Sequence, residues 1–215
     1  MIKATYVDHM GSDLSVVNAA RVSFGKNHKY MTGGDTRLIK YLAKYKHTSP
    51  FGHCFASFHV KAPVFVARQL VKHKFLRWNE ISRRYVDDEP EFFHPDTWRG
   101  CSDDKKQGSS DEEITNIGGT NISVNSKAWL HNGRSISLYR DMIGSGIAPE
   151  QARMILPQNT MTEWYWSGSL DAFSDMCNLR CKSDTQYETR VVADQINEIM
   201  LDLFPVSWEA LGELS

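Results

Sequence analysis

The chain has 215 residues, of which 41% are hydrophobic and 24% are charged, and its formal net charge is −1. This composition indicates a globular protein of one domain spanning residues 1–215, and the near-zero charge argues against a nucleic-acid partner. No apolar run approaches the roughly 20 residues of a membrane span, and the amino-terminal residues lack a signal-peptide core, so we expect a cytoplasmic protein with no membrane partner.

The first third of the chain is predicted to alternate between strands and helices, because apolar side chains recur at strand or helix spacing between short polar loops. A residue that can cap a helix stands before each helical pattern. In chain order we expect a strand over residues 1–10, a helix capped by Ser12 or Asp13, a loop over residues 25–34, a helix capped by Asp35, and a strand over residues 54–60.

The next stretch carries the most distinctive chemistry. Pro63 is suited to begin a helix, because the N–H group that proline lacks has no partner at that position anyway. Six lysine or arginine residues and His73 lie within residues 68–84, where Glu80 is the one carboxylate. This local positive charge favours a single anionic ligand, and residues 78–84 are expected to form a loop. A basic helix end that only faces solvent is the alternative interpretation.

Residues 87–127 differ from the rest of the chain, because they are rich in Gly, Ser, Asn and Asp and poor in large apolar side chains. Such a composition does not offset the entropy of ordering, so we expect a polar loop or insertion there. Its role stays open, and a tolerated surface insertion is the simplest interpretation. Further helices are expected from Lys127, from Pro149, over residues 170–181 and up to Pro205.

Cysteine and histidine spacing does not indicate a metal site. The cysteines at positions 54, 101, 177 and 181 include no CxxC pair, and His47, His53 and His59 match no compact ligand motif. We therefore expect free thiols and no bound metal.

Several linked motifs resemble one family. Lys72-His73-Lys74, followed after seven residues by Ser82, resembles the Arg-His-Arg, seven residues, Ser signature of flavin-dependent thymidylate synthases. The resemblance spans nearly the whole chain outside residues 87–127. It implies an α/β (α+β) fold in which a mixed, largely antiparallel sheet is flanked by helices. The other resembling segments are AARVSF at 19–24, HTSPFGH at 47–53, FHVKAPVFVARQ at 58–69, NEISRRY at 79–85 and NLR at 178–180.

The resemblance implies reductive methylation of deoxyuridylate (dUMP) to thymidylate (dTMP). The family takes its one-carbon unit from 5,10-methylenetetrahydrofolate and its reducing equivalents from NADPH, through FAD. A homotetramer with active sites between subunits is also implied. A nucleotide-binding relative without catalysis is the alternative, and a nucleic-acid-binding module that uses the basic stretch is a weaker one.

The resemblance also assigns roles to individual residues. Arg180 would stabilise negative charge that develops on uracil, since arginine stays protonated beside an anion. Ser82 is expected to position the substrate, because the sequence offers no evident base to activate it as a nucleophile. The implied sets are catalytic Arg180, His47 and Ser82; substrate-binding Gln69, Lys72, Glu80, Ser82, Arg84, Arg153 and Arg180; and cofactor-binding Ser49, Lys72, His73, Lys74, Glu80 and Ser169.

Two departures from the family pattern concern FAD. Lys72 and Lys74 replace both signature arginines, which keeps the charge but loses the planar, two-pronged donor. Where the family usually has Asn-x-Arg, this chain reads Ser169-Leu170-Asp171, and an aspartate cannot supply a cationic contact. No GxGxxG motif lies between a strand and a helix, so a Rossmann site is not indicated. Weaker or differently arranged FAD binding is therefore expected.

Overall fold

The computed structural model describes residues 1–85, 88–103, 108–119 and 121–212. Its centre is a four-stranded sheet of order β1-β2-β6-β3, in which each pairing is antiparallel. The predicted α/β fold with a largely antiparallel sheet flanked by helices is confirmed. The strands of this sheet are β1 (Lys3–Met10), β2 (Phe55–Pro63), β3 (Leu76–Glu80) and β6 (Met161–Ser169).

The core lies on one face of the sheet, because side chains alternate between the two faces along β2 and β6. Phe58 lies opposite Trp166 and Val60 opposite Trp164, and all four are at most 1% exposed. Burial of each such side chain stabilises the fold by about 1.5–3 kcal/mol. The other face is polar, and the hydroxyl oxygens of the opposite residues Ser57 and Ser167 lie 2.8 Å apart there.

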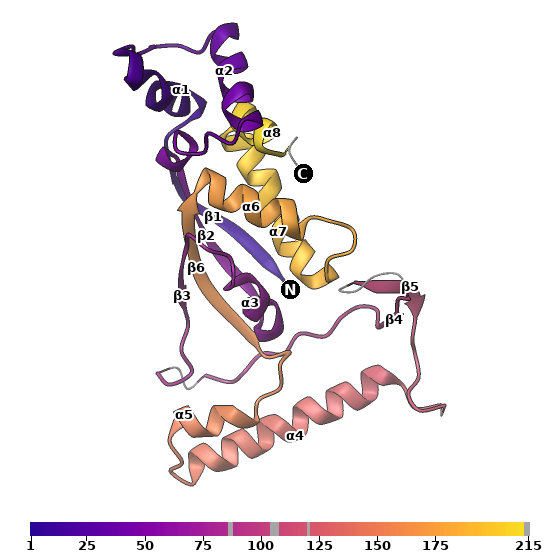
Figure 1. Cartoon of the computed structure of the whole chain (residues 1–215). Helices are drawn as coiled ribbons and strands as arrows, with labels where there is room; N and C mark the ends of the chain where they lie inside the picture. Colours follow the sequence, from indigo (N-terminus) through magenta and orange to yellow (C-terminus); the bar gives the residue numbers. More distant parts are fainter. Residues whose placement is uncertain (86–87, 104–107, 120, 213–215) are drawn as a thin grey trace.

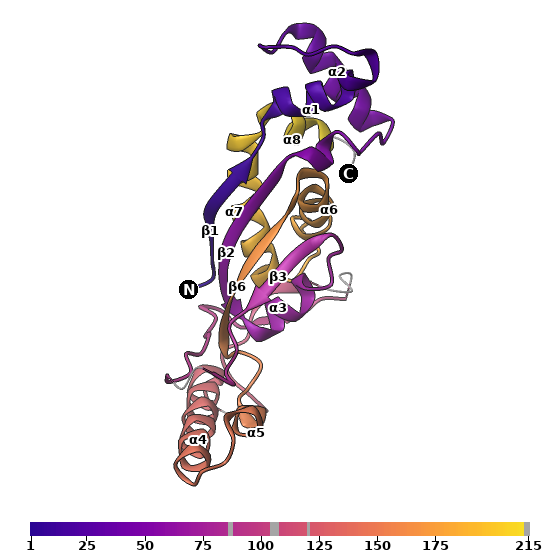
Figure 2. The same ribbon diagram turned by 90° about the vertical axis from the view of Figure 1, so that its left-hand side faces the viewer.

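Helices cover the apolar face and extend the molecule at both ends (Figures 1 and 2). None of the described helices is both long and apolar enough to cross a membrane. Three helices lie against the sheet, α3 (Val64–Leu70), α6 (Leu170–Arg180) and α7 (Tyr187–Leu203). At one end of the sheet are α1 (Asp13–Arg21), α2 (Gly33–Lys44) and α8 (Pro205–Gly212), and at the other are α4 (Val124–Gly144) and α5 (Pro149–Ala152).

The expectation of a loop over residues 78–84 is wrong for its first part, because β3 continues to Glu80. Trp78 stacks on Trp164 of β6, with ring centroids 4.3 Å apart, and this contact fixes the pairing. Gly168 suits this close approach, since a Cβ atom there would lie 2.3 Å from Leu76 Cδ2 and 3.2 Å from the backbone carbonyl oxygen of Phe75. Apolar and polar side chains do alternate from Leu76 to Asn79, but a run this short is a weak signal in the sequence.

Several helix boundaries differ from the prediction. The cap of α2 is Thr32, and Asp35 is the third helical residue of a capping box, so the prediction of Asp35 as the cap is wrong. Pro63 precedes α3 as its cap and also ends β2, and α4 begins three residues before Lys127. The short helix α8 was not predicted, while the expectation of free thiols is confirmed for all four cysteines.

The segment predicted as a polar loop or insertion, residues 87–127, contains regular structure. The antiparallel strands β4 (Arg99–Cys101) and β5 (Ser109–Glu113) form a hairpin, and α4 begins within the segment. Backbone pairing also ties it to the main body, because the Phe93 N–H donates to the Asn159 carbonyl at 2.8 Å. Positions 87, 104–107 and 120 of that prediction lie outside the described residues.

Candidate active site

Residues 71–75, which we call the signature segment, include the basic triplet at 72–74 and form the connection between α3 and β3. Within it, half-buried His73 meets the end of α6, where Arg180 Nε donates to His73 Nε2 at 3.0 Å. Because arginine is only a donor, Nε2 is the acceptor and the imidazole proton sits on Nδ1. Burial and the adjacent Arg180 charge lower the pKa of His73 to about 4. At neutral pH the positive charge of this pair therefore resides on Arg180.

The rest of the signature segment faces solvent. Lys72 and Lys74 are exposed, and the next residue, Phe75, is 83% exposed with a left-handed φ of 65°. A bulky residue in that backbone region is strained, which marks the position as one held by its surroundings. Sequence reasoning missed Phe75, because an apolar residue after a basic triplet gives no signal of its exposure.

Gln69, at the end of α3, joins the same group of residues. Its Oε1 accepts a hydrogen bond from Thr189 Oγ1 at 3.2 Å, and its Nε2 donates to Gln186 Oε1. Both partners lie at the start of α7, more than a hundred residues away in the sequence. The contact with His73 thus adds Arg180 to four predicted residues that lie close together in the sequence, and we call the five the signature group, namely Gln69, Lys72, His73, Lys74 and Arg180.

A second group of predicted residues lies beyond the other end of β3. Glu80 accepts hydrogen bonds from Thr162 Oγ1 at 2.7 Å and from Trp78 Nε1 at 3.2 Å. Glu80 lines a cavity of about 450 Å³ together with Arg153 and Arg68.

Two further members of this second group contact each other, because Arg84 Nε donates to Ser82 Oγ at 3.0 Å. An arginine rather than a base therefore faces the serine oxygen, which fits a positioning role better than nucleophilic attack. We call the set at this end of β3 the strand-end group, and it consists of Glu80, Ser82, Arg84 and Arg153.

Members of the two groups lie at opposite ends of β3. The strand extends roughly 13 Å from Leu76 to Glu80, with His73 before it and Arg84 after it. Three predicted residues belong to neither group. His47 and Ser49 are exposed between α2 and the 3₁₀ turn at 51–53, where His47 stacks on Tyr41, and Ser169 is the cap of α6.

The signature segment fits an anionic dinucleotide with an aromatic ring system. Two exposed ammonium groups suit phosphates, and the exposed phenyl ring of Phe75 suits stacking. Position 171 does not fit a cationic contact. Asp171 Oδ1 is buried without a hydrogen-bond partner in the described part of the chain, and burial with the Asp171 charge raises the pKa of Asp175.

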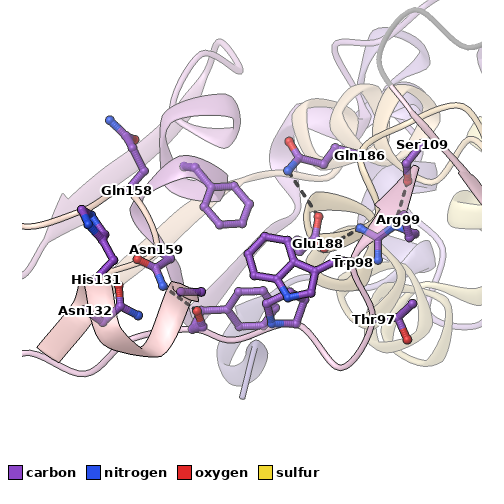
Figure 3. A pocket seen from close by; sticks show the side chains of 14 residues that line it. Thr97, Trp98, Arg99, Ser109, His131, Asn132, Gln158, Asn159, Gln186 and Glu188 are labelled. Atoms are coloured by element: carbon purple, nitrogen blue, oxygen red, sulfur yellow. Dashed lines mark hydrogen bonds and ion pairs between the residues drawn. The ribbon is translucent and has the colours of Figure 1, made fainter. Parts of the chain in front are cut away.

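A further cavity, of about 430 Å³, lies between the β4–β5 hairpin, α4 and the start of α7 (Figure 3). Among its lining residues are Trp98, Arg99, Gln186 and Glu188, and none of the described residues that the sequence predicted for the site is among them. Gln186 nevertheless accepts a hydrogen bond from Gln69 Nε2, so the lining of this cavity is connected to the signature group. Sequence reasoning missed these residues, because contacts between distant segments leave no periodic signal.

Comparisons with known proteins agree on one family. The family model described as thymidylate synthase complementing protein matches residues 5–206. A flavin-dependent thymidylate synthase of Thermus thermophilus is 38% identical over 209 residues, covering 96% of this chain and 74% of that protein. One from Thermosipho melanesiensis is 36% identical over 207 residues, covering 95% and 87%.

A solved structure agrees with these sequence comparisons. The UMP/dUMP methylase PolB of Streptomyces cacaoi, bound with 5-Br dUMP, superposes with a TM-score of 0.82 at 30% identity. The match covers 99% of this chain and 95% of that one. This chain therefore belongs to the flavin-dependent thymidylate synthases, a family of methyltransferase enzymes.

Proposed function

We propose that the signature group and the strand-end group bind dUMP and FAD for the reaction of this family, the reductive methylation of dUMP to dTMP. 5,10-Methylenetetrahydrofolate is the one-carbon donor and NADPH the reductant. The observation that carries the assignment of residues is the contact between Arg180 and neutral His73, because it leaves one partly buried cation beside the signature segment.

Arg180 acts on the pyrimidine in this proposal. Carbon 5 of uracil becomes nucleophilic when negative charge on the ring is stabilised, and a guanidinium beside ring nitrogen 3 supplies that stabilisation. Partial burial strengthens the interaction, since less water screens it. His73 adds no competing positive charge, and its Nε2 holds the guanidinium in place. Gln69 contributes a donor and an acceptor for the pyrimidine edge.

The phosphate of dUMP is assigned to the strand-end group. Arg84 and Arg153 are exposed cations that suit a phosphate, and the Ser82 hydroxyl adds a hydrogen bond. Glu80 is oriented by Thr162 and Trp78 for contacts with the sugar or the flavin.

FAD is assigned to Lys72, His73 and Lys74, with Ser49, Glu80 and Ser169 contributing from other elements and His47 close to both ligands. When bound, FAD passes reducing equivalents from NADPH to the one-carbon unit. The residues of this chain bind and orient it.

The separation of the two groups supports active sites that lie between subunits. One nucleotide needs a pyrimidine contact and a phosphate clamp together. Of the residues that we assign to these roles, Arg180 contacts His73 before β3, whereas Arg84 follows the strand. A second copy that brings its strand-end group to the first copy's signature group would complete the site. We therefore propose a homotetramer of single-domain subunits that works in the cytoplasm.

FAD titration tests the cofactor assignment. We expect saturable binding, followed by flavin absorbance, that approaches one FAD per chain, with weaker binding after Lys72→Ala. Lys127→Ala, an exposed lysine on α4, is the matched control and should leave the affinity unchanged. Absence of saturable FAD binding in the wild-type protein would contradict the proposal.

A further inference from the structure

We infer that the β4–β5 hairpin sets the orientation of the Gln69 side-chain amide, through Arg99, Glu188 and Gln186, and so makes the site choose uracil over cytosine. The inference rests on the proposed role of Gln69 in binding the pyrimidine. In this inference residues 87–127, for which the sequence indicated no role, take part in the choice of substrate.

The contacts form one continuous chain of hydrogen bonds. Arg99 Nη2 donates to Glu188 Oε1 at 2.5 Å, and Gln186 Nε2 donates to Glu188 Oε2 at 3.2 Å, as Figure 3 shows. Gln69 Nε2 then donates to Gln186 Oε1, and Thr189 Oγ1 donates to Gln69 Oε1 at 3.2 Å. Each member uses a different atom for each neighbour.

Arg99 is itself held in place by the hairpin. Its Nε donates to Ser109 Oγ on β5 at 2.7 Å, and its guanidinium lies 4.7 Å from the centroid of the Tyr187 ring. The side chain of its partner Glu188 is only 7% exposed. A carboxylate removed from water to this degree requires a paired cation, and Arg99 is that partner and holds Glu188 in position.

The charge of Glu188 determines which way both amides point. The nitrogen and oxygen of a glutamine amide have nearly the same shape, so only the partners decide its orientation. An ionised carboxylate only accepts hydrogen bonds, so Gln186 must turn its nitrogen to Glu188 and its oxygen to Gln69. Gln69 must then turn its nitrogen to Gln186. Reversal of either amide would bring two donors or two acceptors together.

A fixed amide distinguishes the two pyrimidines. Half-buried Gln69 retains one N–H and one lone pair for a ligand after its two internal contacts. Uracil offers an N–H at position 3 beside a carbonyl at position 4, whereas cytosine offers an acceptor beside an amino group. An amide that could turn over would serve both patterns, but a fixed one serves only one. With dUMP as the substrate, that pattern is uracil's.

Two variants test the inference through the ratio of dissociation constants for dCMP and dUMP, measured by calorimetry on the FAD-loaded protein. Glu188→Gln removes the acceptor-only member at constant shape, and Gln186→Met breaks the chain while leaving the Arg99 ion pair intact. We expect the dCMP-to-dUMP ratio to fall by roughly tenfold in each. Glu198→Gln, an exposed position on the same helix, should leave the ratio unchanged.

The outcomes separate this inference from the proposed function. An unchanged ratio in Gln186→Met, with dUMP still bound, would overturn the inference and leave the proposed function standing. Parallel weakening of both nucleotides would also overturn it, because it would show a merely structural role. Absence of dUMP binding to the wild-type protein would overturn both proposals. Because Gln186→Met keeps the buried ion pair, the test does not depend on the folding of Glu188→Gln.

Discussion

Two basic side chains meet at the contact between Arg180 and His73, and the fold tolerates them because only the arginine is charged. If this guanidinium stabilises developing charge on uracil, Arg180→Ala should lower kcat for dTMP formation by roughly 10²–10³-fold. Arg180→Lys keeps a cation without the planar donor set, so its kcat should lie between those of the wild-type protein and Arg180→Ala. Near-normal turnover of Arg180→Ala, with the fold intact by circular dichroism, would contradict the role.

His73 gives a second prediction, for pH. Its pKa falls from 6.5 to about 4 in the folded protein, first through burial and second through Arg180. Because the unfolded chain binds the proton more readily, the contribution of His73 is fully present above pH 6.5 and is lost as the pH falls toward 4. NMR titration of the wild-type protein should show the low pKa of His73. Arg180→Ala should raise this pKa only part of the way to 6.5, because burial still lowers it. An unchanged pKa in that variant would contradict the electrostatic coupling.

Between elements, Asp35 joins α1, α2 and the loop that connects them. Its carboxylate is fully buried and accepts hydrogen bonds from Arg21, His28 and Thr32. Burial alone would raise its pKa, but these hydrogen bonds outweigh burial and lower it. Asp35→Asn removes the charge from a buried pair and should reduce the free energy of unfolding at neutral pH by roughly 3 kcal/mol.

The stability contributed by Asp35 should also depend on pH. Since the folded pKa lies below the usual value of 3.8, the stabilisation is present above that value and is lost as the pH falls below it. Urea unfolding at neutral pH measures the free energy of unfolding of Asp35→Asn and of a control, Asp202→Asn. Asp202 is exposed on α7, so its substitution should change this free energy little. Equal stabilities of the two variants would show that the buried network does not hold these helices.

Elements with strong internal periodicity could be predicted from the sequence, and elements defined by distant partners could not. The strand β2 alternates visibly, whereas β3 is a strand because β6 offers it Trp164 and the bare backbone of Gly168. The same distinction holds in the site. Family motifs indicated Gln69, but its partners at the start of α7 and the ion pair of Arg99 with Glu188 depend on contacts between segments more than eighty residues apart.

For the whole molecule, the positions of the two groups at opposite ends of β3 predict complementation between inactive chains. Arg180→Ala damages the signature group and Arg84→Ala the strand-end group. If each site takes one group from each of two subunits, equal co-expression should leave about a quarter of the sites intact. Activity of purified mixed assemblies should therefore exceed that of either variant alone. No recovery in confirmed mixed assemblies would show that each chain builds its own site.

The most direct test of the account is chromatographic measurement of dTMP formed by the FAD-loaded protein from dUMP, 5,10-methylenetetrahydrofolate and NADPH. We predict dTMP in the complete mixture and none when the folate, the NADPH or FAD is left out. Bound FAD and dUMP with NADPH oxidation but no dTMP would contradict the assignment of this chain as a working thymidylate synthase.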